Sequence, residues 1–265
     1  MSLLDRPAKF ATCINPEQKK SGTEILSELP ASKCPERELA ILDYATSGNL
    51  PNWLQSWIEV PTKHKELEGS FYALPDFLCV GNDHDAFRAR LNPVTAEKIG
   101  AWLEGVLPTK KMVDLIYEAA PQKLVAQQWG PPYDGSMMHT ARWPKQDKKI
   151  SAEMVSKQFV DGDLTAGHLK NVVTGKKLAE KKGQTVGIYG WFQKNGSPIQ
   201  GPNPNFGSHE WDYVDYSHGI RYVFQEMRVG ETVMSVREVL AHPEYHVLLS
   251  HEGPVEHSSY LEYHS

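Results

Sequence analysis

Side chains able to serve as nucleophile, base and acid are densest between His209 and Arg221. Histidine exchanges a proton near neutral pH, a serine hydroxyl can attack a carbonyl, and a guanidinium holds a carboxylate or an oxyanion. We therefore expect Ser217, or a water bound in its place, as the nucleophile and His218 as the base, with Arg221 stabilising the anionic oxygen. The alternative is an ordinary polar loop that ends in a strand.

Ser217 and His218 are neighbours in the chain, so their side chains point to opposite faces if this segment is extended. A turn at Gly219 would change that relation. In a regular strand, Arg221 lies on the same face as Ser217.

A second group, His168 and Lys170, follows Gly167 in a segment that starts at Thr165. In an extended chain the two side chains share one face, and an imidazole beside an ammonium group has a lowered pKa, as a base at neutral pH requires. We expect His168 to act with His218 as acid and base, and Lys170 to share the stabilisation of anionic oxygen. The alternative is a structural histidine in a glycine-containing loop.

Aromatic residues beside Gly190 form a third group, since a glycine lets a flat ring approach the backbone. We expect Tyr189, Trp191 and Tyr216 to line a substrate groove, with Lys194 and Asp215 as polar contacts. The alternative is that these aromatic side chains pack in the core.

A metal site is the alternative to a cofactor-free mechanism. The side chains of His168, His209, Asp215 and His218 would be enough for a two-His-one-carboxylate or three-His site that holds a divalent metal such as zinc. No His-x-x-x-His pair on one helix face supports it, so our first expectation is no cofactor.

The elements that must position these residues indicate an α+β fold, with a helical part over residues 1–160 packed on a mainly antiparallel β-rich part over residues 161–265. One intertwined domain is the alternative. The pattern predicts a helix from Pro35 to Gly48, helices opening at Thr95 and at Thr109, and a Ser235–Glu238 capping box. It also predicts a loop over residues 127–150, a helix from Ser151 to Phe159, and strands over residues 184–192 and 219–225.

Composition excludes several classes of function. The chain has 265 residues and a formal net charge of -5, so it lacks the basic footprint of a nucleic-acid-binding protein. No apolar run is long enough for a membrane-spanning helix. Its three cysteines contain no Cys-x-x-Cys pair; Cys13 and Cys34 either pair in an exported protein or stay as free thiols.

Several motifs resemble a family of uncharacterised bacterial proteins, over most of residues 70–225. This resemblance implies no activity. Members of that family have a histidine where this chain has Phe192, so no catalytic role is assigned to that position. The motifs are Ala166-Gly167-His168-x-Lys170, Ile188-Tyr189-Gly190-Trp191, Pro198-Ile199-Gln200 and Asp215-Tyr216-Ser217-His218-Gly219-Ile220-Arg221.

The segment Ser217-His218-Gly219-Ile220-Arg221, with Val229-Gly230-Glu231-Thr232-Val233 downstream, is also similar to the end of the L,D-transpeptidase catalytic domain. That domain has a nucleophilic cysteine after the glycine, and this chain continues directly with Ile220. The resemblance therefore implies a β-rich fold and a pocket for an oxyanion or carboxylate, without thiolate chemistry.

Together these patterns favour a hydrolase, a cell-wall-directed amidohydrolase or peptidase acting on a peptide or glycan polymer. The alternatives are a metal-dependent hydrolase and a non-catalytic module that binds glycans or peptides. No signal-peptide pattern precedes the first helix, and we slightly favour a periplasmic or secreted protein over a cytoplasmic one.

Overall fold

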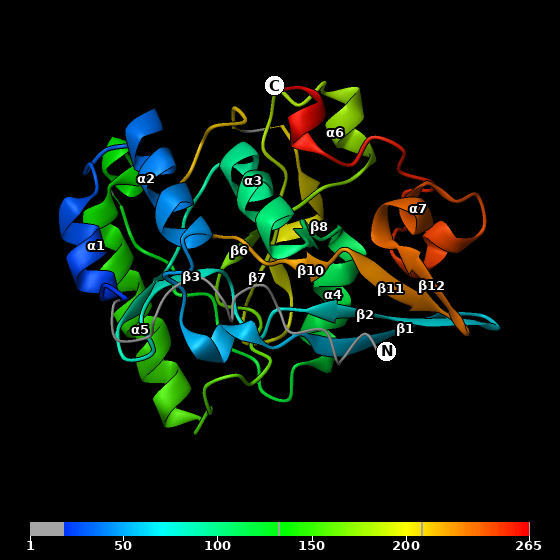
Figure 1. Ribbon diagram of the computed structural model, residues 1–265, viewed down its shortest axis with the longest axis horizontal. Helices are drawn as coiled ribbons and strands as arrows, with labels where there is room; N and C mark the ends of the chain where they lie inside the picture. Colours follow the sequence, from blue (N-terminus) through cyan, green and yellow to red (C-terminus); the bar gives the residue numbers. More distant parts are fainter. Residues whose placement is uncertain (1–18, 132, 208, 265) are drawn as a thin grey trace.

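The computed structural model describes residues 19–131, 133–207 and 209–264. It has the predicted α+β class, with helices packed around two small sheets and a separate hairpin (Figure 1). Among the described strands, all pairs are antiparallel except β6 with β9. The helices are α1 (Gly22–Glu28), α2 (Pro35–Thr46), α3 (Pro93–Leu103), α4 (Lys110–Ala119), α5 (Trp143–Ser156), α6 (Lys176–Glu180) and α7 (Val236–Ala241).

The first sheet has the order β12-β11-β2-β10-β5, and β1 pairs with β2. Strands β1, β2 and β5 precede residue 160 and the others follow it, so the strand pairing crosses the predicted boundary between a helical and a β-rich part. The strands are β1 (Ile58–His64), β2 (Leu67–Ala73), β5 (Gly105–Val106), β10 (Val223–Phe224), β11 (Glu226–Val229) and β12 (Thr232–Ser235).

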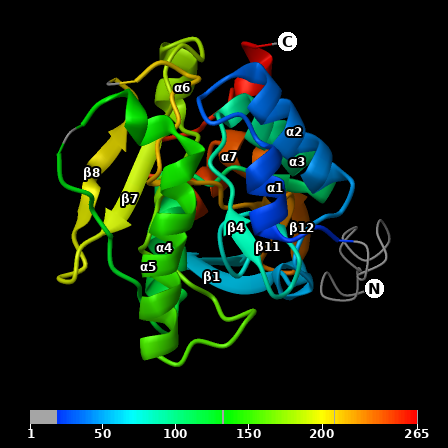
Figure 2. The same cartoon turned by 90° about the vertical axis from the view of Figure 1, so that its left-hand side faces the viewer.

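The second sheet has the order β8-β7-β6-β9 and carries the predicted functional segments. Figure 2 shows β7 and β8 on one side of α4 and α5, with α1, α2 and α3 on the other. The strands of the second sheet are β6 (Lys170–Val172), β7 (Ile188–Phe192), β8 (Pro198–Asn205) and β9 (His218–Gly219). The separate hairpin consists of β3 (Cys79–Gly81) and β4 (Ala86–Arg88).

Helix starts follow from their capping residues. The Thr109 side chain accepts a hydrogen bond from the backbone N–H of Met112 and opens α4, as predicted. Ser235 and Glu238 form the predicted capping box of α7. The start of α3 was predicted too late: Asn92 is its cap and accepts from the N–H of Thr95.

Two predictions are wrong over residues 143–156, which form α5. The loop predicted over residues 127–150 ends before Trp143, and the helix predicted from Ser151 to Phe159 begins eight residues earlier and ends at Ser156. Pro144 is compatible with a first helical turn, where no N–H partner is needed. The Trp143 ring is fully buried and stacks on Phe87 with a centroid distance of 5.9 Å. Burial of this large ring favours a helix here, although the local sequence is polar.

The strand predicted over residues 219–225 is two short strands. The chain leaves the second sheet after Gly219 and enters the first sheet at Val223. Between them, the carbonyls of Ile220 and Tyr222 accept hydrogen bonds from the N–H groups of Leu78 and Leu74. Arg221 therefore lies where one sheet passes into the other.

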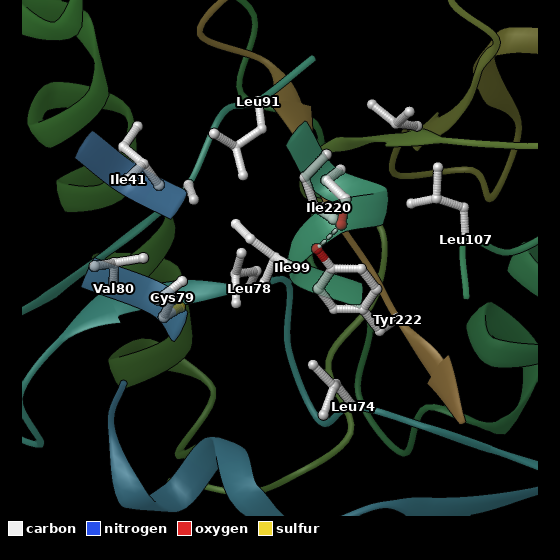
Figure 3. Packing of buried hydrophobic residues seen from close by; sticks show 14 of the residues in the cluster. Ile41, Leu74, Leu78, Cys79, Val80, Leu91, Ile99, Leu107, Ile220 and Tyr222 are labelled. Carbon is white, nitrogen blue, oxygen red and sulfur yellow. Dashed lines mark hydrogen bonds between the residues drawn. The ribbon is translucent and has the colours of Figure 1, made fainter. Parts of the chain in front are cut away.

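The main hydrophobic core packs α2 and α3 against the hairpin β3–β4 and against β6 and β7 of the second sheet. Figure 3 shows Ile99 of α3 close to Tyr222, with Leu74 and Leu78 around them. The Tyr222 hydroxyl donates to the carbonyl of Ala96 at 2.6 Å. A buried tyrosine with a partner for its hydroxyl fixes α3 against the junction of the sheets.

Candidate functional site

The two predicted segments meet in the second sheet. Lys170 lies opposite His218, and Asn171 lies opposite Gly219, in the parallel pair β6–β9. The N–H of Lys170 donates to the carbonyl of Ser217 at 2.8 Å. Side chains of the two segments then divide into two clusters, one around Asp215 and one around Asp76.

The Asp215 cluster contains a buried ion pair. The ammonium group of Lys170 lies 3.2 Å from Asp215 Oδ2, and the two side chains are 9% and 6% exposed. The Tyr213 hydroxyl donates to the same oxygen at 3.4 Å. Burial alone would raise the pKa of Asp215, but the neighbouring His218 and Lys170 and the hydrogen bonds from Ser217 hold it well below its usual value. Asp215 is therefore an ionised acceptor at neutral pH.

Ser217 supports this carboxylate. Its N–H donates to Asp215 Oδ1 at 2.7 Å, and its hydroxyl donates to the same oxygen. The side chain is fully buried and does not line the cavity described below. Nucleophilic attack by Ser217 would require it to leave both the carboxylate and its buried position.

His218 lies behind Tyr213, with their rings edge to face at a centroid distance of 5.7 Å. Its side chain is fully buried, and among the described residues neither ring nitrogen has a hydrogen-bond partner. Burial lowers the pKa of His218 to about 4, with Lys170 and His209 acting in the same direction and Asp215 opposing them. The imidazole is therefore neutral at pH 7.

His209 is half-buried and stacks flat on Tyr213, with ring centroids 3.8 Å apart. Burial lowers its pKa, and Lys170 contributes in the same direction. Two neutral histidines thus flank the Tyr213 ring, beside an ion pair that keeps its charges.

An open cavity of about 190 Å³ gives solvent access to this cluster. The Lys170 ammonium lies 5.1 Å above the Trp191 ring, and Trp191 Nε1 donates to the carbonyl of His168 at 3.1 Å. Tyr133 is 73% exposed at the rim. The lining, hereafter the aromatic cavity, consists of Gln128, Trp129, Tyr133, Asp134, Met137, Lys170, Trp191, Tyr213, Asp215 and Tyr216.

His168 belongs to the other cluster. Its Nε2 lies 3.0 Å from Asp76 Oδ1, and the Arg88 guanidinium lies 2.5 Å from the other carboxylate oxygen. Burial opposes ionisation of Asp76, but Arg88 and His168 hold its pKa well below the usual value. Burial lowers the pKa of His168, against the pull of Asp76. Acid–base action by His168 together with His218 is not supported, since His168 is paired with Asp76 and His218 lies in the other cluster, against Tyr213.

Arg221 serves the backbone rather than a ligand. Its two terminal nitrogens donate to the carbonyls of Leu74 and Thr165, each at 2.8 Å, and its guanidinium lies 4.5 Å from the Phe77 ring centroid. The side chain is 1% exposed, and burial lowers its pKa to about 10. Its predicted role in holding an anionic oxygen has no support in this arrangement.

Two predicted substrate contacts lie away from the aromatic cavity. The Tyr189 hydroxyl donates to Asp114 at 2.8 Å, and Lys110 lies over its ring. Lys194 is exposed in the turn that follows β7. Trp191, Asp215 and Tyr216 line the cavity, as does Lys170, but Trp191 and Tyr216 are only 5% and 3% exposed and also pack in the hydrophobic core, which was the alternative for them.

Sequence reasoning missed Trp129, Tyr133 and Tyr213. The first two lie in the segment interpreted as a loop, and their only signal was aromatic residues among glycine and proline. The Trp129 N–H donates to the Tyr216 hydroxyl at 3.0 Å, which brings this loop over the sheet. Long-range contacts of this kind leave no local pattern in a sequence.

Donor geometry does not support the predicted metal set of His168, His209, Asp215 and His218, because His168 lies with Asp76. Within the described ranges, no three histidine, cysteine, aspartate or glutamate side chains form a group that could hold a metal ion. In the same ranges, no helix combines the length and apolar character needed to cross a membrane. Cys34 has no disulfide to a described residue, and Cys13 lies outside these ranges.

No protein-family model, curated protein sequence or solved structure matches this chain. The chemistry of the site must therefore be argued from its own geometry. Aromatic faces bind flat or apolar ring surfaces, and the Lys170–Asp215 pair offers one charged donor and one charged acceptor.

Proposed function

We propose that the protein binds a peptide or glycan polymer of the cell-wall type through the aromatic cavity. The observation that carries this proposal is the open cavity itself, in which five aromatic side chains surround Lys170 and Asp215. Sugar rings and peptide side chains stack on aromatic faces, while hydroxyl and amide groups use the ion pair. The volume of about 190 Å³ suits one ring or side chain of a longer polymer.

The choice of polymer rests on the resemblance of residues 217–221 to the L,D-transpeptidase catalytic domain. In this chain the cysteine of that motif is missing, and Ser217 is buried against Asp215. Recognition of the polymer needs neither group as a nucleophile. The binding module is therefore the member of the predicted classes that the geometry favours.

Sedimentation with purified peptidoglycan sacculi, followed by titration with soluble muropeptides, tests this proposal. Tyr133→Ala should weaken binding about fivefold, because one stacking face at the exposed rim is lost. Tyr133→Phe keeps the ring and should bind as the unchanged protein does. If the unchanged protein does not sediment with sacculi, or if Tyr133→Ala binds equally well, this function is wrong.

Hydrolysis of the same polymer is a second candidate. The observation that favours it is His218, a neutral imidazole with two unpartnered nitrogens among the described residues, next to Asp215 and Lys170. His218 would have to take a proton from a water that enters behind Tyr213, and its lowered pKa makes it a weak base for this step. Release of soluble fragments from sacculi, abolished in His218→Ala, would support it. Binding without release would reject hydrolysis and leave recognition standing.

A further inference from the structure

The outer face of helix α5 carries a group of cations, hereafter the cationic face. Lys145, Lys148 and Lys149 are exposed, and Arg142, directly before the helix, is half-buried beside them. Because successive residues of a helix are about 100° apart, these four side chains fall within about a third of its circumference. Figure 2 shows α5 in green at the front of the molecule.

The cationic face has little compensating negative charge. None of its four cations forms an ion pair with a described residue. The carboxylates of α5 have other partners, since Asp147 pairs with Arg90 at 2.7 Å and Glu153 pairs with Lys157 at 2.9 Å. Hydrogen bonds within its own turn lower the pKa of Asp134 and Arg142 contributes, so this carboxylate balances part of one cation. The three lysines remain unbalanced.

This arrangement of charge is unfavourable for the protein alone. Lys145 and Lys149 are four positions apart on the helix, where like charges repel each other. Arg142 and Lys145 lie at the start of α5, where the helix dipole disfavours a cation, and no acidic residue lies in that first turn. The chain as a whole has a formal net charge of -5, so a basic composition does not explain the cationic face. A bound anion would relieve the repulsion.

Trp129 joins the cationic face to the aromatic cavity. Its ring lines the cavity, and its Nε1 donates to the side chain of Gln146 in α5 at 2.6 Å. The Arg142 guanidinium lies 5.0 Å from the centroid of this ring and the Lys149 ammonium 4.7 Å. A polymer that enters the cavity beside Trp129 therefore has the cations of α5 next to it.

We propose that the cationic face binds anionic groups of the polymer whose rings enter the aromatic cavity. This inference rests on the proposed function and narrows the ligand to an acidic polymer, one that carries carboxylates or phosphodiesters along its length. Lysine and arginine side chains form charge-assisted hydrogen bonds to both groups. Because the lysines are exposed, salt screens this part of the attraction, whereas stacking in the cavity depends little on salt. A neutral polymer with the same rings would use the cavity alone.

Sedimentation with purified sacculi at low and high salt tests the inference. Replacement of the three lysines of the cationic face should weaken binding about tenfold at low salt and remove most of its dependence on salt. The substitutions are Lys145→Gln, Lys148→Gln and Lys149→Gln, combined in one protein.

The matched control removes the same charge from another surface. Three exposed lysines at α6, which lies far from α5 in Figure 1, are replaced together, and the affinity should not change. The melting temperature of each protein shows whether it is folded. The control substitutions are Lys176→Gln, Lys177→Gln and Lys181→Gln.

Two treatments of the sacculi identify the anion. Hydrofluoric acid removes phosphodiester polymers, and amidation with a carbodiimide neutralises carboxylates. The treatment that removes the recognised group should reduce binding of the unchanged protein to the level of the triple-lysine variant. A single-stranded oligonucleotide is the polyanion of another class, and tighter binding of it than of sacculi would overturn the inference.

The remaining outcomes separate this inference from the proposed function. Equal binding by the folded triple-lysine variant, or unchanged binding after both treatments, would overturn the inference. If Tyr133→Ala still weakens binding in that case, the proposed function stands without it. If the unchanged protein does not sediment with sacculi at all, both are wrong.

Discussion

Lys170 lies directly opposite His218 in the parallel strand pair β6–β9. Register partners on neighbouring strands place their side chains on the same face of a sheet, so the ammonium group and the imidazole share one environment. A second positive charge beside Lys170 is unfavourable, which adds to burial in keeping His218 neutral. Asp215 then balances the single charge of Lys170.

This balance predicts a large loss of stability when one partner is removed. Lys170→Met at pH 7 leaves the Asp215 carboxylate buried without its cation and should lower the free energy of unfolding by about 3 kcal/mol. Urea denaturation followed by circular dichroism measures the change.

Lys63→Met is the matched control, because Lys63 and Glu68 form an exposed pair at 2.6 Å with side chains that are 61% and 67% exposed. Lys63→Met should lower the free energy of unfolding by less than about 1 kcal/mol. Equal effects of the two substitutions would mean that the Lys170–Asp215 pair is solvated in solution.

Arg221 should prove to be structural. Arg221→Ala removes two donors from buried carbonyls of Leu74 and Thr165 and should lower the free energy of unfolding by about 3 kcal/mol or more. Arg221→Lys supplies one ammonium group for two carbonyls and should recover only part of the loss. A folded Arg221→Lys protein that still binds sacculi fully would confirm that this guanidinium does not contact the polymer.

The sequence was informative where the signals are local. The caps at Thr109 and Ser235 and the mixed fold class depend on residues close in the chain, and the structure confirms them. Clustering of chemical residue types also drew attention to Lys170 and Asp215, which do form a pair.

Other features depended on partners far along the chain. Nothing near His168 indicated that Asp76, in a different part of the fold, would be its partner. The local pattern around Arg221 could not show that its donors would go to backbone carbonyls. Trp129 reaches the aromatic cavity through the Tyr216 hydroxyl, a contact that no spacing rule predicts.

The lowered pKa of His218 predicts a loss of stability in mild acid. In the unfolded chain this imidazole has a pKa near 6.5, and in the folded protein about 4. Between these values the unfolded state binds more protons, so stability is full above pH 6.5 and falls as the pH drops towards 4. His218→Gln removes this titrating group, so the decrease in the free energy of unfolding between pH 6.5 and pH 4 should be smaller by about 3 kcal/mol. Urea denaturation at a series of pH values measures it. An unchanged slope would mean that His218 titrates normally in the folded protein.

The raised pKa of Glu38 predicts that stability changes with pH in the opposite direction, over a similar pH interval. Its pKa of about 7 in the folded protein exceeds the value near 4.3 of an unfolded glutamate, so here the folded state binds more protons. Stability is full below pH 4.3 and is lost as the pH rises towards 7. Glu38→Gln should remove this loss, making the protein more stable than the unchanged chain at pH 8. A destabilised Glu38→Gln protein at pH 8 would contradict the assigned burial of the charge.

The backbone at Gly167 leaves no room for a side chain. Its φ is +102°, and a Cβ atom there would lie 2.1 Å from the carbonyl oxygen of Leu124. The same segment supplies the carbonyl of His168 to Trp191 Nε1 and the carbonyl of Gly167 to the N–H of Phe192. Gly167→Ala should therefore lower the free energy of unfolding by about 3 kcal/mol or more.

Because Trp191 is held by this segment, folded Gly167→Ala should also bind sacculi more weakly. Gly135→Ala is the control, since a Cβ at Gly135 meets no atom within 4 Å and that glycine has no positive φ. That substitution should change stability by less than about 0.5 kcal/mol and leave binding intact. Thermal unfolding combined with sedimentation measures both effects. If the two alanine variants behave alike, the backbone at Gly167 does not hold Trp191 in place.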